Sequence, residues 1–224
     1  MRTRALAVAL LLLPIFGCRS LRPTVHEKPV EAIAPAGADA VRAGLAERLA
    51  TFAGERSLLR VRATAGERTQ SFRAQLQVDR DRRMLLTAYT PLGTTALRLY
   101  AEGGTVTFLN DIESTWWRGS ASELAHTFPF FASLDPSTMA LILLGLAPSQ
   151  STVTYEIGVG GLRAASAGEA TVDFDPDVYP PKRVSVRTAA GQLEIDHLES
   201  VVSAGMVERP EIPKSYRCCT APAL

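Results

Sequence analysis

The chain has 224 residues, of which 46% are hydrophobic, and its formal net charge is +1 at pH 7. This length allows one domain with a sizeable core and some additional segments. The near-neutral charge argues against a nucleic-acid-binding protein, because such proteins usually carry a strongly basic surface. We therefore expect no nucleic-acid partner.

The N-terminus has the pattern of a secretory signal peptide. Arg2 and Arg4 precede an apolar run, residues 5–16, that leads into Gly17 and Cys18. The run is too short to span a membrane, which takes about 20 apolar residues. A basic start followed by a short apolar stretch is typical of a secretory signal.

The end of this segment resembles the lipobox of bacterial lipoproteins, in which a small residue precedes a cysteine. By that resemblance the signal peptide covers residues 1–17 and Cys18 carries the lipid, although Phe16 departs from the small residue usual at its position. An ordinary secretory signal with an incidental cysteine is the alternative. Arg19 follows the cysteine, where enteric lipoproteins retained in the inner membrane have aspartate. The resemblance thus implies the periplasmic face of the outer membrane.

Residues 18–39 predict an extended tether. The segment is rich in proline and alanine and has no apolar period. A tether of about 20 residues is long enough to hold a domain clear of a lipid surface. A helix is expected next, with Asp39 as its N-cap and Gly54 as its stop. Its apolar face, which we expect to pack on a sheet, consists of Val41, Leu45, Leu49 and Phe52.

From residue 59 onward the apolar period changes to two, which is typical of half-buried strands. The consecutive hairpins predict an antiparallel meander of about 11 strands. The expected strands are residues 59–64, 71–78, 83–89, 94–101, 105–109, 115–118, 152–157, 162–166, 170–174, 182–188 and 192–200.

Two helices are predicted between the sixth and seventh strands. Ser120 and Glu123 fit a capping box for a short helix that reaches about Phe128. Asp135 and Pro136 fit the start of a second helix. Residues 139–144 of that helix are apolar on nearly every side, so the helix is expected to be buried all round and is too short to span a membrane.

The fold class expected from these elements is mainly β. A long antiparallel sheet tends to curl, which predicts a half-open, incomplete β-barrel with one apolar face, formed by residues 40–200. The apolar helix would cover the open mouth as a lid over an apolar cavity. The lid residues expected to line it are Met139, Leu141, Ile142 and Leu144. A core filled by side chains is the alternative.

Residues 201–224 form a Pro-rich tail in which disorder is expected. Cys218 and Cys219 are adjacent there. Neighbouring cysteines cannot easily reach ordinary disulfide geometry; a strained bridge, a bond to another chain and two free thiols all remain open.

The sequence contains no recognisable catalytic or metal-binding motif. His26, His126 and His197 are not paired with a nucleophile at motif spacing, and no Gly-x-Ser-x-Gly is present. The run from Asp173 to Asp177 resembles a calcium loop, but valine occupies the glycine and glutamate positions of that motif. We expect a non-enzymatic protein without metal or cofactor.

Two stretches resemble the LolB family of outer-membrane lipoprotein receptors, within the LolA/LolB superfamily. "LLTAYTPLGTTALRLYAEGGTVTFLND" has the family's Pro-Leu-Gly turn between two strands, and "SELAHTFPFFASLDPSTMALILLGLAP" resembles its helical insertion. The resemblance implies an incomplete barrel with a helical lid. It also implies a receptor that takes lipoprotein acyl chains from a periplasmic LolA-like carrier and inserts the lipoproteins into the outer membrane, where its own lipid anchors it.

Leu92 lies at the tip of the Thr90–Gly93 turn, where Pro91 and Gly93 suit the second and fourth positions. It matches the exposed apolar residue that the LolB family uses in membrane insertion. The alternative is that Leu92 folds back against Tyr89. Two other functions remain open: a carrier of another lipid or glycolipid, and a structural envelope module with a filled core. The chain is expected to be a monomer.

Overall fold

The computed structural model describes residues 35–125, 134–149, 151–158, 161–174, 180–189 and 191–218. Predicted features outside these ranges include the signal peptide, Cys18, most of the tether, the part of the first lid helix beyond Ala125, and Cys219. The described ranges belong to one compact unit, which begins at Ile33.

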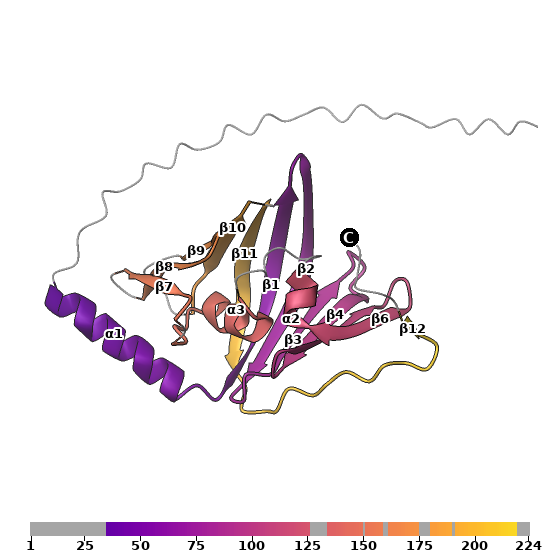
Figure 1. Ribbon diagram of the computed structural model, residues 1–224, viewed down its shortest axis with the longest axis horizontal. Coiled ribbons are helices and arrows are strands. Elements are labelled where there is room, and N and C mark those ends of the chain that lie inside the picture. The colour runs from indigo at the N-terminus through magenta and orange to yellow at the C-terminus, as the bar shows by residue number, and fades with distance from the viewer. Residues whose placement is uncertain are drawn as a thin grey trace, which may run out of the picture. The chain divides into compact units, whose positions relative to one another are not determined.

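That unit is built on a single sheet of 12 strands (Figure 1). Neighbouring strands are antiparallel except for the last one, β12, which runs parallel to β6. The first strand lies in the middle and pairs with both β2 and β11, so the meander begins and ends at the centre of the sheet. The two edges, β12 and β7, are not paired with each other in the described residues, so the sheet is not closed.

The predicted strands are all present, with ends that differ by a few residues, and β12 is an addition that the sequence pattern did not predict. Their bounds are β1 Gly54–Ala65, β2 Arg68–Asp79, β3 Met84–Tyr89, β4 Thr95–Glu102, β5 Thr105–Asn110, β6 Thr115–Ser120, β7 Thr154–Ile157, β8 Leu162–Ala167, β9 Ala170–Phe174, β10 Arg183–Thr188, β11 Gly191–Val202 and β12 Arg217–Cys218.

Helix α1 (Pro35–Ala50) begins earlier than expected. Asp39 is not its N-cap: it lies within the helix and forms an ion pair with Arg42, at 2.9 Å. Proline is tolerated in the first turn because the amide hydrogen it lacks would have no partner there. The predicted apolar face is confirmed for the helix, since Leu45 is buried and Val41 and Leu49 are partly buried against the core. Phe52 also packs there, but it lies beyond the end of the helix.

Gly54 is the first residue of β1 and does not end the helix. Its φ of 137° is open to glycine and strained for other residues. A Cβ at this position would lie 2.2 Å from the backbone oxygen of Ser203. Glycine is therefore required by the close approach of two chain segments, which the sequence could not reveal.

Helices α2 (Ala121–Ala125) and α3 (Pro136–Leu143) follow β6, as predicted. The capping box of α2 is reciprocal: Glu123 N–H donates to the Ser120 hydroxyl at 3.2 Å, and Ser120 N–H donates to the Glu123 carboxylate at 3.1 Å. At the start of α3, the Asp135 carboxylate accepts a 3.0 Å hydrogen bond from Thr138 N–H. The start signals of both helices are thus confirmed.

The sheet has two faces, which we call the inner and the outer face. The inner face carries the alternate apolar side chains that join the hydrophobic core, and α3 packs on it against β2, β3 and β4. The outer face carries the intervening side chains, which are mostly polar on β1 and β8–β11. Representative members of the inner face are Leu59, Val61, Leu76, Leu99, Phe108, Trp117, Val172, Val184 and Ile195.

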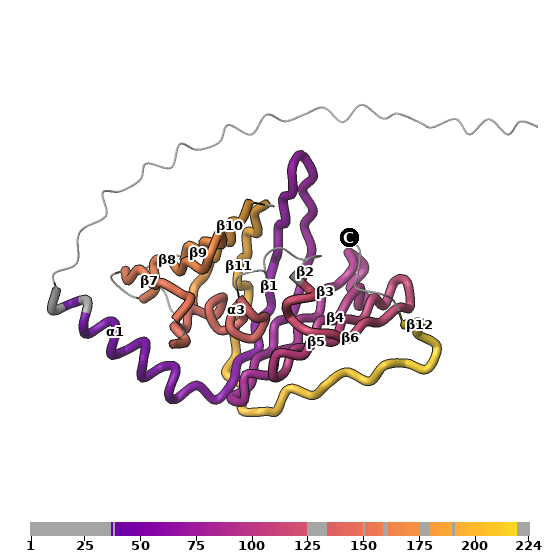
Figure 2. Tube along the Cα trace, viewed as in Figure 1, coloured from indigo at the N-terminus to yellow at the C-terminus, as the bar shows by residue number. Residues whose placement is uncertain are grey.

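Residues 203–218 form an ordered strap, so the prediction of a disordered tail is wrong for this segment. Figure 2 shows it leaving the end of β11 and crossing to β6, where it forms β12. Val207 is buried against the sheet, whereas the residues around it are exposed. Beneath the strap, outer-face residues that would otherwise meet water are buried, namely Tyr100, Thr107 and Leu109.

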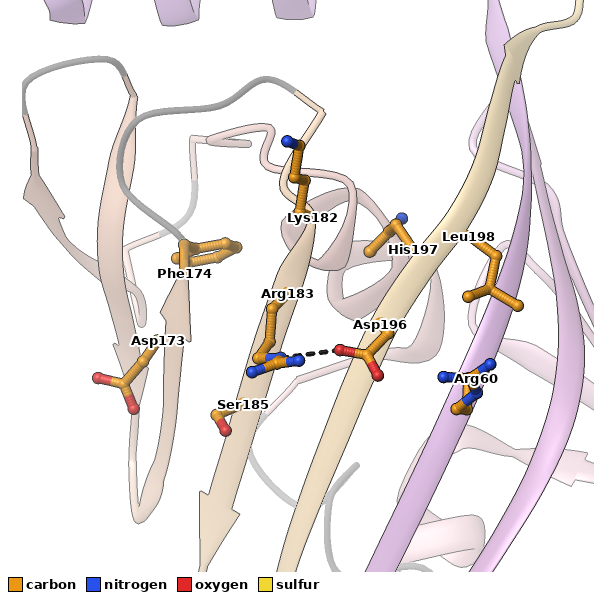
Figure 3. A pocket seen from close by; sticks show the side chains of 9 residues that line it. All are labelled: Arg60, Asp173, Phe174, Lys182, Arg183, Ser185, Asp196, His197 and Leu198. Carbon is orange, nitrogen blue, oxygen red and sulfur yellow. Dashed lines mark hydrogen bonds and ion pairs between the residues drawn. The ribbon is translucent and has the colours of Figure 1, made fainter. Parts of the chain in front are cut away.

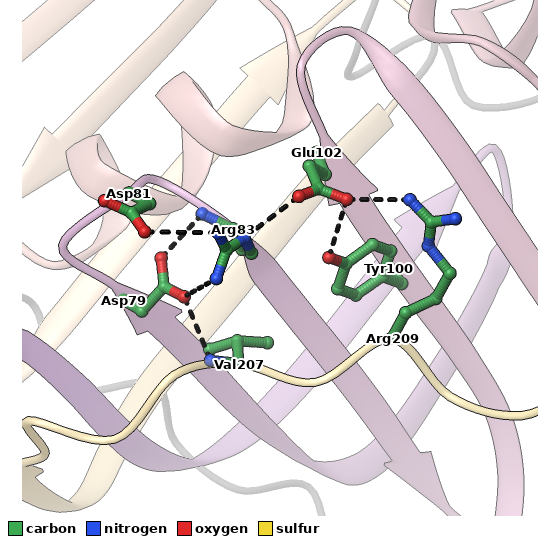
Figure 4. Close-up of polar contacts among 7 residues, drawn as sticks. All are labelled: Asp79, Asp81, Arg83, Tyr100, Glu102, Val207 and Arg209. Carbon is green, nitrogen blue, oxygen red and sulfur yellow. Dashed lines mark hydrogen bonds and ion pairs between the residues drawn. The ribbon is translucent and has the colours of Figure 1, made fainter.

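Polar contacts hold the strap in place (Figure 4). Asp79 accepts hydrogen bonds from the backbone N–H groups of Val207 and Arg83, both at 2.9 Å. Glu102 accepts from Arg209 at 2.7 Å and from Arg83 at 2.9 Å. The Arg209 guanidinium also lies 5.5 Å from the ring centre of Tyr100, within the range of a cation–π contact. Sequence period could not predict the contacts made by Val207 and Arg209, because they join segments more than 100 residues apart.

Candidate functional site

The turn between β3 and β4 is closed by its own backbone. Gly93 N–H donates to the Thr90 carbonyl at 2.9 Å, and Thr90 N–H donates to the Thr94 carbonyl at 2.8 Å. Gly93 has a φ of 82°, so the turn is the common three-residue hairpin loop with a left-handed last residue. The expected places of Pro91 and Gly93 are confirmed, and no contact in the turn depends on the side chain between them.

That side chain, Leu92, is 92% exposed. The alternative in which it folds back against Tyr89 is therefore wrong. Turns are normally polar at this position, and an exposed leucine contributes little to the stability of a hairpin. Leu92 is the most exposed of the large apolar side chains in the described residues.

The four predicted lid residues, Met139, Leu141, Ile142 and Leu144, are all buried in the core on the inner face. The helix is apolar on every side, as expected, and its last turn is closed by Gly145 in the left-handed region, with φ 77°. In this structure the helix itself occupies the inner face over β2, β3 and β4. That the helix covers an apolar cavity as a lid stays a prediction.

His197 lies on β11 close to the end of α3. Neither ring nitrogen is accessible to water, and neither makes a hydrogen bond of ordinary geometry to a described residue. Burial lowers the pKa of His197 to about 4, while the backbone of Leu143 in α3 and the Asp196 carboxylate act weakly in the opposite direction. The ring is thus neutral at pH 7, next to the helix proposed as the lid.

A polar groove of about 720 Å³ runs over β9, β10, β11 and β1 (Figure 3). Charged side chains dominate its lining, and the Arg183 guanidinium donates to Asp196 across it at 2.8 Å. A second groove, of about 240 Å³, lies between the end of α1 and the start of β1. Neither of these two grooves is the apolar cavity that the sequence predicts, because charged residues line both.

The predicted residues do not form one compact site. Leu92 lies at the end of two strands, whereas the lid residues lie on the inner face, and Cys18 lies outside the described residues. Sequence reasoning missed Ile112, which is 71% exposed in the β5–β6 turn. The signal was the same as for Leu92, an aliphatic residue in an otherwise polar turn.

The described residues lack the features of two other kinds of site. No cluster of three or more histidine, cysteine or acidic side chains has the geometry to hold a metal ion in this part of the chain. No described helix combines the length and apolar character that crossing a membrane requires. The Asp173–Asp177 run, which resembles a calcium loop, lies only partly within the described residues.

The fold has counterparts among solved structures, although no family model and no curated protein sequence matches the chain. A putative outer membrane lipoprotein-sorting protein domain from Vibrio parahaemolyticus superposes with a TM-score of 0.53 and 8% identity, over 75% of this chain and 93% of that one. A DUF1329 family protein from Desulfovibrio piger gives 0.52 and 10% identity, over 77% and 94%.

A LolA superfamily protein from Nitrosomonas europaea superposes more loosely, with a TM-score of 0.45 and 10% identity over 73% of this chain and 93% of that one. Only the first two superpositions are close enough to establish a common fold. The chain therefore shares with these two structures one fold: a large, open, mostly antiparallel sheet with few helices.

Proposed function

We propose that this chain is an envelope lipoprotein that binds acyl chains of other lipoproteins under α3 and delivers them to the outer membrane. The observation that carries the proposal is Leu92, a leucine presented to solvent on a turn that does not need it. Burying a leucine is worth about 1.5–3 kcal/mol, which is too little for stable anchoring but enough to favour entry of the tip into a bilayer.

The fold and the lid helix support the binding step. The sheet offers a broad apolar inner face, and α3 packs over part of it with apolar side chains of its own. The similarity to a lipoprotein-sorting domain is a similarity of fold and supports the same class of ligand. The proposed role is binding and transfer, with no chemical step, and the proposed source of cargo is a LolA-like carrier that meets the monomeric chain.

Stable attachment would come from the lipid on Cys18. Changing Cys18→Ala should leave an unprocessed precursor, detected by its larger mass and by labelling with radioactive palmitate. Normal processing and secretion of the variant would contradict the lipoprotein assignment and favour an ordinary secretory signal.

A structural module with a filled core is the second candidate. The complete burial of Leu141 and Ile142 against the sheet favours it, because the inner face under α3 is already occupied by these side chains. Titration with a fluorescent acyl-chain probe separates the two candidates. Saturable binding supports the carrier, and no binding at any concentration favours the module.

The delivery step is tested by comparing Leu92→Glu with the wild-type protein. We expect unchanged binding of the acyl-chain probe, because the exposed Leu92 side chain is not part of the inner-face core. We also expect slower transfer of a bound lipoprotein into liposomes, because a charge resists entry into the bilayer. Val202→Glu is a matched control, since Val202 is 79% exposed at the opposite end of the sheet. Equal transfer by all three proteins would remove Leu92 from the mechanism.

A further inference from the structure

Ile112 is held outward by a turn as well defined as that of Leu92. The Asn110 side-chain oxygen accepts hydrogen bonds from the N–H groups of Ile112 and Glu113, both at 3.1 Å. The Asn110 amide in turn donates to the Glu113 carboxylate at 3.1 Å. Ser114 completes the turn in the left-handed region, with φ 53°. These contacts satisfy the turn without any use of the aliphatic side chain.

Asp111 fixes the base of this turn. Its carboxylate accepts a 3.0 Å hydrogen bond from Arg98 on β4 and another from the Tyr216 hydroxyl of the strap. The strap also reaches the turn through its backbone, where Arg217 N–H donates to the Ser114 carbonyl at 3.0 Å. The turn that carries Ile112 is therefore bonded to both the sheet and the strap. Insertion of this turn into a membrane would fix the orientation of the domain relative to the membrane.

The tips that carry Leu92 and Ile112 are neighbours at one end of the sheet. Strands β4 and β5 are adjacent and antiparallel, and Asn110 pairs with Leu97. Asp111 N–H donates to the Ala96 carbonyl at 2.9 Å, two residues after Thr94, where the β3–β4 turn ends. Figure 1 shows the β3–β4 and β5–β6 hairpins ending on the same side, away from the β2–β3 turn.

Aromatic and basic side chains that suit a membrane interface lie around the tips, beside one exposed acidic residue, Glu113. Half-buried aromatic residues, Tyr89 and Trp116, lie on the strands just behind the two turns. The strap adds the exposed basic residues Lys214 and Arg217 beside the β5–β6 turn. Tyrosine and tryptophan favour the headgroup region of a bilayer, and basic groups are attracted to anionic lipids.

We propose that Ile112 and Leu92 enter the same anionic phospholipid surface and act as a two-point membrane contact. This inference rests on the proposed delivery role of Leu92 and adds a second insertion point with a fixed orientation. One tip leaves the domain free to swing about its contact, whereas two adjacent tips define a line on the membrane.

The test uses the full chain, reconstituted from membranes into vesicles of phosphatidylethanolamine and phosphatidylglycerol. Single cysteines replace Leu92, Ile112 or Val202 in a background in which Cys218 and Cys219 are serine, and each is labelled with an environment-sensitive fluorophore. Val202→Cys is the control because Val202 is as exposed as Ile112 and lies at the other end of the sheet. The measurements are the emission maximum and quenching by brominated lipid.

We expect a blue shift and quenching for labels at positions 92 and 112, and neither effect at position 202. If the label at position 92 enters the bilayer and the label at position 112 stays in water, the two-point contact is overturned and the proposed function stays intact. Labels that stay in water at both positions contradict the insertion role of Leu92 as well. Equal quenching at all three positions overturns the inference, because it indicates adsorption without orientation.

A second measurement separates membrane entry from docking to a protein. Replacing phosphatidylglycerol with a neutral lipid should reduce the quenching at position 112, because Lys214 and Arg217 then lose their counter-charges. Quenching that does not change with lipid charge overturns the role given to the anionic surface. A label at position 112 that is shielded only by an added carrier protein, and never by lipid, indicates a protein-docking surface and overturns the proposal.

Discussion

The outer face of the sheet differs between its two halves. On β3–β6 the strap covers it, and Tyr100, Thr107 and Leu109 are buried beneath. On β1 and β9–β11 it is open to solvent and carries ion pairs between neighbouring strands, namely Arg62–Glu194, Arg183–Asp196 and Arg187–Asp173. The first half is thus packed on both faces, and the second half is packed on its inner face alone.

This difference bears on the proposed site, because both apolar tips belong to the half that is packed on both faces. Exposed ion pairs contribute about 0–1 kcal/mol each and restrict the sheet weakly. A buried carboxylate that accepts backbone hydrogen bonds restricts it more strongly, since removing the acceptor leaves buried donors unpaired. A rigid first half would hold the tips in a constant geometry, while the second half remains free to adjust.

The largest effect is expected where α3 meets the inner face. Leu141→Asp places an unpaired charge at a side chain that is 1% exposed and should destabilise the protein by more than about 4 kcal/mol, with loss of acyl-chain probe binding. Urea unfolding and probe titration measure the two effects. Leu141→Met, which conserves volume, is the control and should cost less than about 1.5 kcal/mol. Wild-type stability of the aspartate variant would mean that α3 is detached in solution.

The next largest effect is expected from a pair of variants that compares the stability contributed by the two halves of the sheet. Asp79→Ala leaves the N–H groups of Val207 and Arg83 without their acceptor and should cost about 2–4 kcal/mol. Asp196→Ala in the second half breaks an ion pair whose arginine is 71% exposed, and it should cost less than about 1 kcal/mol. Urea unfolding gives the two values.

Limited trypsin digestion is the companion measurement for the same pair of variants. Faster cleavage after Lys214 and Arg217, which are followed by Ser215 and Cys218, is expected for Asp79→Ala alone, because that variant frees the strap. Equal costs and equal cleavage rates in the two variants would contradict the difference between the halves.

Acid should weaken the contact between α3 and the second half through His197. Because burial lowers the pKa of His197 to about 4, its contribution is present above pH 6.5 and is lost as the pH falls toward 4. The slope is at most about 1.4 kcal/mol per pH unit. Melting temperatures at pH 7.5 and pH 5 should therefore differ more for the wild type than for His197→Gln.

Glu55 has the opposite effect on the pH dependence of stability. Burial raises the pKa of Glu55, so its contribution to stability is greatest at low pH and is lost as the pH rises through the raised value. Both proteins contain Glu55, so the difference between them isolates His197. An identical pH dependence in the wild type and in His197→Gln would show that the ring is already accessible in solution.

The smallest effect on stability is expected at the tip. Leu92→Glu should change the free energy of unfolding by no more than about 0.5 kcal/mol, because the side chain is exposed and the turn is closed by backbone hydrogen bonds. Thermal unfolding measures it, with Leu92→Ser as a polar, uncharged control. A drop of several degrees in both variants would mean that Leu92 packs against the domain in solution.

Local patterns in the sequence determined most of the elements of this protein. Alternation with a period of two marked the strands from β1 to β11, because one face of each strand is buried and the other is less so. The Asp135–Pro136 and Ser120–Glu123 signals marked the two helix starts, and the Thr90–Gly93 turn identified Leu92 as a tip residue. Each of these signals depends on residues a few positions apart, within one element.

The tertiary structure alone decided which distant segments meet. It paired β1 with β11, it brought the strap back to Asp79, Glu102 and Asp111, and it placed the Ile112 tip beside the Leu92 tip. It also required glycine at position 54, where the chain passes close to Ser203. These features depend on contacts between residues far apart in the chain, and the free energy of such contacts leaves no periodic trace in the sequence.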